Sequence, residues 1–117
     1  MAWWVYMLRC RDGSLYTGLA KYLCRRMHEH FERTAACAKY TRSRPVTALE
    51  AVWRTETRSA AASLEALIKS LPRARKLALI AAPDTLLPRY ADRLPAAEYA
   101  PLSGITLKMC LDNSAML

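Results

Sequence analysis

The segment that most constrains the fold is a hairpin pattern near the N-terminus, VYMLRCRDGSLYTG at residues 5–18. An apolar run with a β-branched and an aromatic residue leads into Asp-Gly, and a second such run follows. This order is typical of two antiparallel strands joined by a tight turn. Each arm carries one tyrosine, Tyr6 and Tyr16. Side chains alternate between the faces of a sheet, so the length of the turn decides whether the two tyrosines share a face.

Two turn lengths are compatible with this segment. A two-residue loop, DG, pairs Arg9 with Tyr16 and directs Tyr6 and Tyr16 to opposite faces. A three-residue loop, RDG, pairs Leu8 with Tyr16 and makes the tyrosines diagonal neighbours on one face. Gly13 can supply the left-handed residue that a three-residue loop needs, but Asp-Gly is also a strong signal for the shorter loop. The turn residues alone leave both registers open.

The rest of residues 1–82 predicts one small mixed domain. Apolar residues recur at helical spacing in residues 21–35 and 58–71, and a shorter helix is expected in residues 73–82. A third strand is expected in residues 46–53, directly after a proline that disfavours helix before it. The expected fold is of the α/β class in the α+β sense, with a small three-stranded, mainly antiparallel sheet flanked by two or three helices.

The character of the chain changes after residue 82. Prolines at positions 83, 88, 95 and 101 interrupt any long regular element. Residues 104–111 suit either a late strand or a short helix. We therefore divide the chain into a domain at residues 1–82 and a C-terminal extension at residues 83–117, which we expect to pack on the domain.

Positive charge is concentrated in the N-terminal two thirds of the chain. The formal net charge is +8, and residues 1–80 carry 15 basic and 6 acidic residues, against 3 and 4 in residues 81–117. Such a surplus suits a polyanion such as nucleic acid. The alternative is that the charge only keeps a small protein soluble. No apolar run approaches the roughly 18 residues that a membrane span needs, so no membrane partner is expected.

The cysteine pattern favours a reducing compartment. The four cysteines form no C-x-x-C motif, and with only two histidines a structural zinc site has little support. Met1 leads straight into the strand-like WWVYML without a secretory signal. We therefore expect reduced thiols and a cytoplasmic location.

The two tyrosines lie in triplets that resemble the motif of the GIY-YIG endonuclease family. VYM at residues 5–7 stands where the family has GIY, and YTG at residues 16–18 stands where it has YIG. Val5 replaces the glycine of the family's first triplet, and Met7 replaces the tyrosine that ends it.

Further matches follow in the order and spacing of that family. The family carries an arginine and a histidine on the helix after the hairpin and a single acidic residue on a later helix, and these are matched by Arg26, His30 and Glu65. AKYTRSRP at residues 38–45 and IKSLPRARKLALI at residues 68–80 resemble the small stand-alone bacterial members. The resemblance covers roughly residues 3–80.

This resemblance implies a metal-dependent endonuclease that hydrolyses DNA phosphodiester bonds by attack of water. Tyr6 would accept the proton of the water, with Tyr16 as its positioning partner, although a phenol is a poor base unless nearby positive charge stabilises the phenolate. Arg26 would stabilise charge on the phosphate, and His30 would orient a phosphate or shuttle a proton. Glu65 would hold one divalent cation, Mg²⁺ or Mn²⁺.

That chemistry decides between the two registers of the hairpin. Tyr6 and Tyr16 can act together only if they share a face. We therefore predict the three-residue loop, with Gly13 in the left-handed conformation.

The basic segments are expected to hold DNA, whether duplex, branched or single-stranded. Tyr40 would stack on an unpaired base, and the candidate phosphate contacts are Lys21, Arg25, Lys39, Arg42 and Arg44. No second DNA-reading module is evident, so cleavage should be structure- rather than sequence-selective, in DNA repair or processing. The alternative is a non-catalytic nucleic-acid-binding module or an accessory subunit on the same scaffold. Glu65 argues against pure binding, because a carboxylate facing phosphate needs a cation between them. The oligomeric state stays open.

Overall fold

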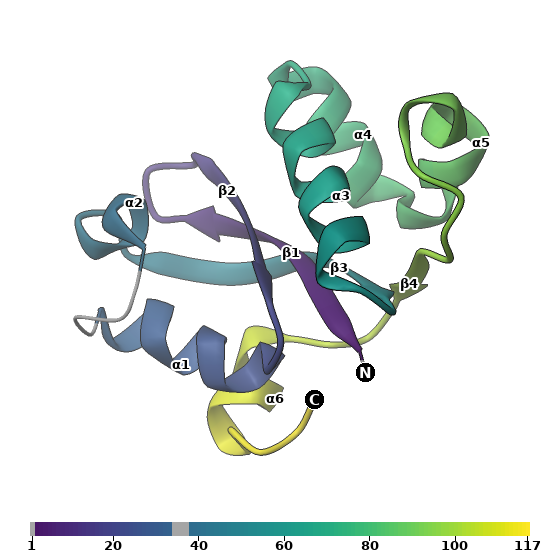
Figure 1. Cartoon of the computed structure of the whole chain (residues 1–117). Coiled ribbons are helices and arrows are strands. Elements are labelled where there is room, and N and C mark those ends of the chain that lie inside the picture. The colour runs from purple at the N-terminus through teal and green to yellow at the C-terminus, as the bar shows by residue number, and fades with distance from the viewer. Residues whose placement is uncertain (1, 34–37) are drawn as a thin grey trace.

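An antiparallel sheet of four strands, in the order β2-β1-β3-β4, forms the centre of the protein (Figure 1). The computed structural model describes residues 2–33 and 38–117. The strands are β1 (Trp3–Cys10), β2 (Leu15–Ala20), β3 (Val46–Thr55) and β4 (Ala100–Leu102). The expected α+β class and antiparallel sheet are confirmed. The fourth strand is a correction to the three that the sequence predicts.

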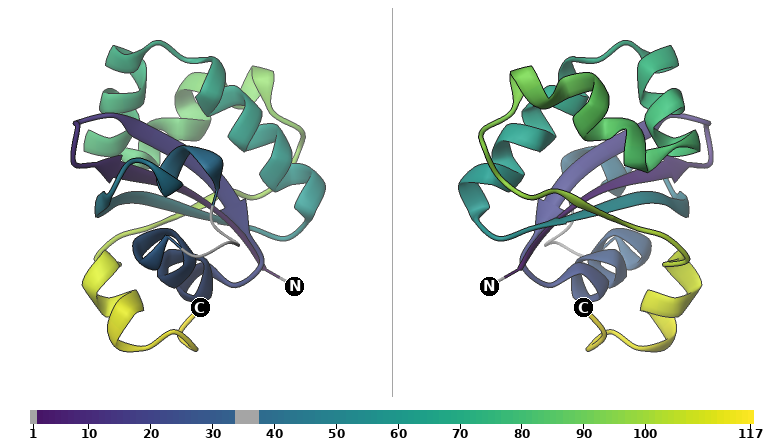
Figure 2. Two further views of the ribbon diagram at one scale, coloured as in Figure 1. Left: turned by 90° about the vertical axis from the view of Figure 1, so that its left-hand side faces the viewer. Right: turned by 90° about the vertical axis from the view of Figure 1, so that its right-hand side faces the viewer.

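Helices cover both faces of this sheet (Figures 1 and 2). One face carries α1 (Leu23–Glu32) and α6 (Leu107–Asp112), and the other carries α3 (Arg58–Ser70), α4 (Arg73–Ala81) and α5 (Leu86–Tyr90). The short α2 (Lys39–Arg42) precedes β3, and two 3₁₀ turns, η1 (Pro83–Thr85) and η2 (Ala91–Arg93), flank α5. Within the described residues, no helix combines the length and the apolar character needed to cross a membrane.

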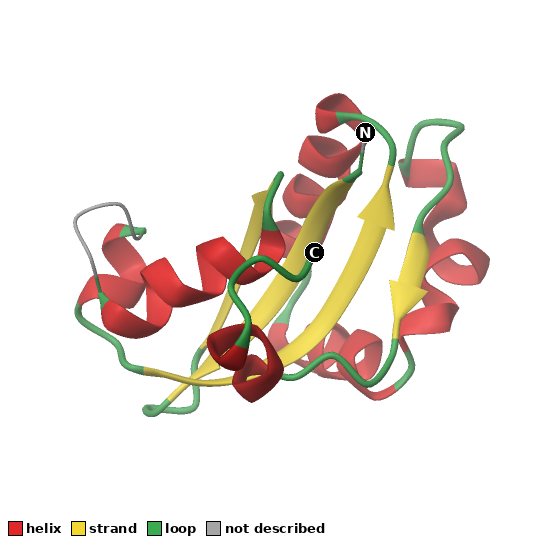
Figure 3. Cartoon of the chain, turned by 90° about the horizontal axis from the view of Figure 1, so that it is seen from below, coloured by secondary structure: helices red, strands yellow, loops and turns green. Residues whose placement is uncertain are grey.

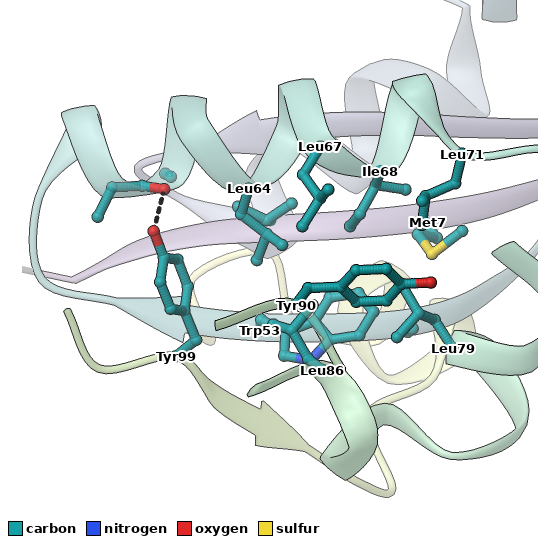
Figure 4. Packing of buried hydrophobic residues seen from close by; sticks show 14 residues of the cluster. Met7, Trp53, Leu64, Leu67, Ile68, Leu71, Leu79, Leu86, Tyr90 and Tyr99 are labelled. Atoms are coloured by element: carbon teal, nitrogen blue, oxygen red, sulfur yellow. Dashed lines mark hydrogen bonds between the residues drawn. The ribbon is translucent and has the colours of Figure 1, made fainter. Parts of the chain in front are cut away.

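The central strand β1 is buried on both sides, so its alternating side chains build two cores. Val5 and Met7 pack with the apolar face of α3, and Trp53 of β3 lies in the same cluster (Figure 4). Tyr6 and Leu8 point to the opposite face, where they pack with the apolar stripe of α1. The period-2 pattern of β1 therefore directs Tyr6 towards α1.

Local sequence signals set the ends of α3, the helix that carries Glu65. The side chain of Thr57 caps its N-terminus by accepting a hydrogen bond from the backbone N–H of Ala60 at 3.1 Å. Leu71 at its C-terminal end is extended, as expected for the residue before a proline. Glu65 therefore lies in the middle of the helix, on a rigid element.

The C-terminal extension passes from one face of the sheet to the other (Figure 3). Leu86, Tyr90 and Tyr99 join the core beneath α3, and the Tyr99 hydroxyl donates to the backbone oxygen of Ala60 at 2.8 Å (Figure 4). The chain then forms β4 and continues into α6, which packs against α1.

The fourth strand escapes sequence prediction for a physical reason. It has three residues, one of which is Pro101, in a segment whose prolines argue against regular structure. Proline is tolerated there because β4 is an edge strand, which needs hydrogen bonds on one side only. Residues 104–111, which the sequence leaves open, contain all of α6 except its last residue. Thr106 caps it by accepting a hydrogen bond from the N–H of Met109 at 3.2 Å.

A disulfide bond between Cys24 on α1 and Cys110 on α6 fixes the extension to the domain. The prediction of reduced thiols is wrong for this pair. The two residues are 86 positions apart, and their approach depends on the packing of α6, which the sequence does not reveal. Cys10 is free and buried, and Cys37 lies outside the described residues. The cytoplasmic location, inferred from reduced thiols, stays a prediction.

The double variant Cys24→Ala/Cys110→Ala should lose about 4 kcal/mol of unfolding free energy, because the bond closes a long loop in the unfolded chain. Urea unfolding with and without a reductant measures this loss. The double variant is also the control, since the reductant must leave its stability unchanged. If the wild-type stability stays the same after thiol titration shows the pair reduced, the bond does not stabilise the fold.

Candidate active site

The β1–β2 hairpin has the three-residue loop that the chemistry of the tyrosines requires. Leu8 pairs with Tyr16 and Tyr6 pairs with Gly18. Gly13 has a φ of 85°, and its N–H donates to the backbone oxygen of Cys10 at 2.9 Å. The predicted register and the left-handed glycine are thus confirmed. The rings of Tyr6 and Tyr16 lie on one face with centroids 6.4 Å apart.

Gly18 makes room for both tyrosines. A Cβ atom at this position would lie 2.5 Å from Oη of Tyr6, closer than such atoms approach in folded proteins, and 3.0 Å from Cε2 of Tyr16, which is tighter than most Cβ contacts. The absence of a side chain opposite Tyr6 therefore allows both rings to lie over β2. The glycine of the second triplet thus has a steric role in the site.

A chain of three buried side chains runs from Tyr6 through α1 to α2. Oη of Tyr6 lies 2.7 Å from Nε2 of His30, and Nδ1 of His30 lies 2.7 Å from Oγ1 of Thr41. The Thr41 hydroxyl donates its single proton to the backbone oxygen of Ala38 at 3.2 Å. Thr41 must therefore accept from Nδ1–H of His30, which leaves the Nε2 lone pair to accept from the Tyr6 hydroxyl.

Burial fixes the protonation states in this chain. Tyr6, His30 and Thr41 expose 1%, 0% and 0% of their surface. Burial lowers the pKa of His30 to about 4, and the charge of Arg26 adds to this effect. Burial also raises the pKa of Tyr6 well above its usual value, and Tyr16 contributes to that rise. At neutral pH the site therefore holds a phenol that donates to a neutral imidazole.

Arg26 places a positive charge near the hydroxyl of Tyr6. Its guanidinium opposes the rise in the pKa of Tyr6 through its charge and a hydrogen bond. Its side chain is 24% exposed, and Nη1 donates to Oε1 of Glu29 at 2.8 Å. Arg26 is thus held by a carboxylate one helical turn away while it faces the tyrosine. No pattern in the sequence predicts this role of Glu29.

Glu65 reaches the site from the opposite face of the sheet. Its carboxylate is among the causes that raise the pKa of Tyr6, its side chain is 24% exposed, and Oε2 lies 3.6 Å from Nζ of Lys69. Within the described residues, no three His, Cys, Asp or Glu side chains form a metal cluster. One hard carboxylate oxygen suits Mg²⁺ or Mn²⁺, which keep several waters and take further ligands from a substrate phosphate. The donor set therefore fits such an ion.

Aromatic and cationic side chains extend from the tyrosine pair in a row that we call the aromatic ladder, composed of Arg44, Tyr40, Tyr16 and Lys69. The rings of Tyr16 and Tyr40 are stacked, with centroids 5.7 Å apart and planes at 28°. The Arg44 guanidinium lies 4.1 Å from the Tyr40 ring, and Nζ of Lys69 lies 5.9 Å from the Tyr16 ring. The ladder joins the segment around α2 to the last turn of α3.

The other predicted DNA contacts lie near the tyrosine pair and the aromatic ladder. Lys21 and Arg25 line a surface pocket with Arg26, at the start of α1. Lys39 and Arg42 are exposed on α2, next to ladder and site residues.

Thr41 is the principal residue that sequence reasoning misses. It stands in a run of basic residues, KYTRSR, where a small polar residue is expected to face water. Its complete burial results from the packing of α2 against His30, which no local sequence pattern predicts.

The lowered pKa of His30 predicts a loss of stability in acid. Between pH 6.5 and pH 4 the unfolded chain binds a proton at this residue that the folded chain does not. Lowering the pH through this window should therefore cost about 3 kcal/mol. Urea unfolding at a series of pH values measures this slope, which should be reduced in His30→Gln. The matched control is His28→Gln, the other histidine of α1. Equal slopes in wild type and His30→Gln contradict the assignment.

The chain is similar in sequence to known proteins. Residues 2–78 match the model of the GIY-YIG catalytic domain. A UPF0213 protein of Fusobacterium nucleatum is 45% identical over 87 residues, which cover 74% of this chain and 85% of that protein. A UPF0213 protein of Xanthomonas axonopodis is 41% identical over 80 residues, covering 68% and 76%.

A solved structure is also similar to this chain. The solution NMR structure of a UPF0213 protein from Bacillus halodurans is 38% identical, covers 69% of this chain and 84% of that chain, and has a TM-score of 0.45. The match to the catalytic-domain model spans more than half of the residues, and it includes both tyrosines, Arg26, His30 and Glu65. The chain therefore belongs to the GIY-YIG family.

Proposed function

We propose that this protein is a metal-dependent endonuclease that hydrolyses DNA phosphodiester bonds. The observation that carries the proposal is the buried Tyr6–His30–Thr41 chain, with Arg26 on one side and Glu65 on the other. Membership of a nuclease family supports the reaction class. The hydrogen bonds from Tyr6 through His30 to Thr41 all point in one direction, which gives the hydrolysis a route for proton transfer at neutral pH.

The hydrogen bonds support a relay in which Tyr6 is the base and His30 the final proton acceptor. Burial keeps Tyr6 protonated, so a standing phenolate does not start the reaction. Oη of Tyr6 instead takes the proton of the attacking water while it passes its own proton to Nε2 of His30. Nδ1–H of His30 stays bonded to Thr41 throughout. The imidazolium that forms then has a hydrogen-bond acceptor at each nitrogen.

Arg26, Tyr16 and Glu65 position the substrate in this scheme. The Arg26 guanidinium stays charged at any working pH and stabilises negative charge on the phosphate oxygens. Tyr16 is half-buried, lies beside Tyr6 and orients the water at the rim of the buried network. A divalent cation held by Glu65 would polarise the phosphate and neutralise the departing oxygen.

The aromatic ladder favours DNA with an unpaired base near the cut. In the structure the Tyr40 ring lies between Tyr16 and the Arg44 guanidinium, so a base would stack on Tyr40 in the place that Arg44 occupies. Such stacking accepts any base, because every base has a π-face, so it selects for DNA structure rather than sequence. Single-stranded and branched DNA offer such bases, and the base pairs beside a nick can fray to offer one, whereas intact duplex offers none. A role in DNA repair or processing is consistent with this preference.

Glu65→Gln tests the enzymatic function directly. The variant should lose at least about 100-fold in metal-dependent cleavage, because it removes the carboxylate that holds the cation while keeping its shape. Plasmid and labelled single-stranded, forked and nicked DNA are incubated with Mg²⁺ or Mn²⁺. Glu56→Gln, which alters a surface carboxylate paired with Arg54, is the control.

The same assay addresses the non-catalytic alternative. Wild-type protein that binds DNA but cleaves none of these substrates, with unchanged affinity in Glu65→Gln, would show that the scaffold serves binding only.

Thr41→Val tests the proton relay. The valine keeps the shape of Thr41 but removes the acceptor for Nδ1–H of His30, so we expect kcat to fall about 10- to 100-fold. KM for DNA should stay nearly constant, because Thr41 acts through His30 and touches no substrate. Steady-state cleavage of the preferred DNA measures both constants. Thr41→Ser restores the hydroxyl and should recover most of the activity; a serine variant as slow as the valine variant contradicts the relay.

A further inference from the structure

The turn between α3 and α4 carries positive charge that the proposed reaction does not use. We call this group the basic corner, composed of Lys69, Arg73, Arg75, Lys76 and Arg93. From residue 66 to residue 82 the chain has four basic residues and no acidic one. Arg93 of η2 joins them by donating from Nη2 to Oγ of Ser70 at 3.2 Å. All five side chains are exposed except Lys76, which is half-buried.

The basic corner is continuous with the active site. Lys69 belongs to both, since its Nζ lies 3.6 Å from Glu65 and 5.9 Å from the Tyr16 ring. Arg73 follows four residues later, which limits its Cα to about 14 Å from that of Lys69 even in an extended chain. A DNA strand carries one phosphate per roughly 3.4 Å of helix axis. A strand that crosses Tyr16 therefore brings several phosphates within reach of the corner.

The basic corner and the predicted DNA contacts of α1 lie on opposite sides of the sheet. Figure 1 shows α3 and α4 above the strands and α1 below them, with α2 beside the β1–β2 hairpin, and the left view of Figure 2 shows the same arrangement from the hairpin side. Glu65 and Lys69 reach the site from α3, and Arg26 and His30 reach it from α1. The catalytic group thus has cations on two sides.

The charges of the corner are placed where they weaken the fold. The first turn of α4 has Arg73, Arg75 and Lys76 but no acidic residue and no side-chain cap. Each cation at the positive end of a helix dipole costs roughly 0.3–1 kcal/mol. Among residues 2–33 and 38–117, no ion pair neutralises these three side chains. Three cations that cost stability and form no ion pair within the described residues fit a polyanionic ligand.

We propose that the basic corner binds the phosphates of the DNA strand on the side of the cut that lies away from α1 and α2. The protein then holds its substrate on both sides of the scissile bond, and efficient cleavage needs nucleotides on each side. This inference rests on the proposed nuclease function.

The variant Arg73→Gln/Arg75→Gln tests the corner. Binding of fluorescent single-stranded and nicked DNA is measured by anisotropy over a salt series in EDTA. The variant should bind about 10-fold more weakly at low salt. Its slope of log K against log salt should fall by about 1.4 on single-stranded DNA and by about 1.8 on nicked duplex, which is about 0.7 and about 0.9 per lost phosphate contact. Its melting temperature should stay equal or rise, because two cations leave the start of α4. The control, Arg54→Gln/Lys108→Gln, has the same net charge and alters cations on β3 and α6.

Cleavage of shortened substrates gives a second readout. Wild-type protein should cleave more slowly when the DNA is shortened on either side of the cut. The cleavage rate of the corner variant should no longer depend on the length of the DNA on one side of the cut. The cleavage rate of Lys21→Gln/Arg25→Gln should no longer depend on the length of the DNA on the other side.

The possible failures are distinguishable. If wild-type protein binds and cleaves DNA while the corner variant behaves like its control in both assays, the inference about the corner is wrong and the nuclease function stands. If wild-type protein neither binds nor cleaves any of the substrates, the proposed function is wrong and the inference fails with it.

Discussion

The site depends first on the register of one hairpin. The Arg-Asp-Gly loop places Tyr6 opposite Gly18 and Tyr16 opposite Leu8, so both rings lie over the strand pair on the face that α1 covers. A loop shorter by one residue would turn one tyrosine to the other face, because side chains alternate along a strand. The period-2 pattern of β1 keeps Tyr6 towards α1, so Tyr16 is the ring that a shorter loop would turn away. The turn at Gly13 therefore decides whether the two tyrosines lie together in the site.

The site lies at the β2 edge of the sheet, so helices from both layers can contribute side chains to it. Because β2 is an edge strand, Lys69 on α3 reaches Tyr16 although α3 packs on the face opposite α1. A site over the central strand β1 would be reached from one face only. This position also brings the Glu65 carboxylate of α3 near the buried phenol of Tyr6, while the carboxylate itself stays partly exposed. A partly exposed carboxylate and a buried hydrogen-bonded network can thus lie side by side.

The sequence predicts the parts of this site that depend on local patterns. The hairpin, the helix that carries Arg26 and His30, and the helix that carries Glu65 follow from turn residues and apolar periodicity, and the chemistry of paired tyrosines selects the correct loop. Thr41, β4 and the disulfide bond could not be predicted, because each depends on packing between segments distant in the chain. A hydroxyl in a basic loop has the same local signature whether it faces water or a buried imidazole.

The C-terminal extension explains why the β2 edge can stay available. A sheet has two edges, and each exposes backbone groups that can pair with another chain. At the far edge, β4 covers β3 with a strand of three residues that includes a proline, which is a poor template for further pairing. The extension then crosses to α1 and is fixed there by the disulfide bond. The β2 edge, which carries Tyr16, is the longer of the two. Around it lie α3, Tyr40 and the cations of the aromatic ladder, whose side chains suit phosphate and bases.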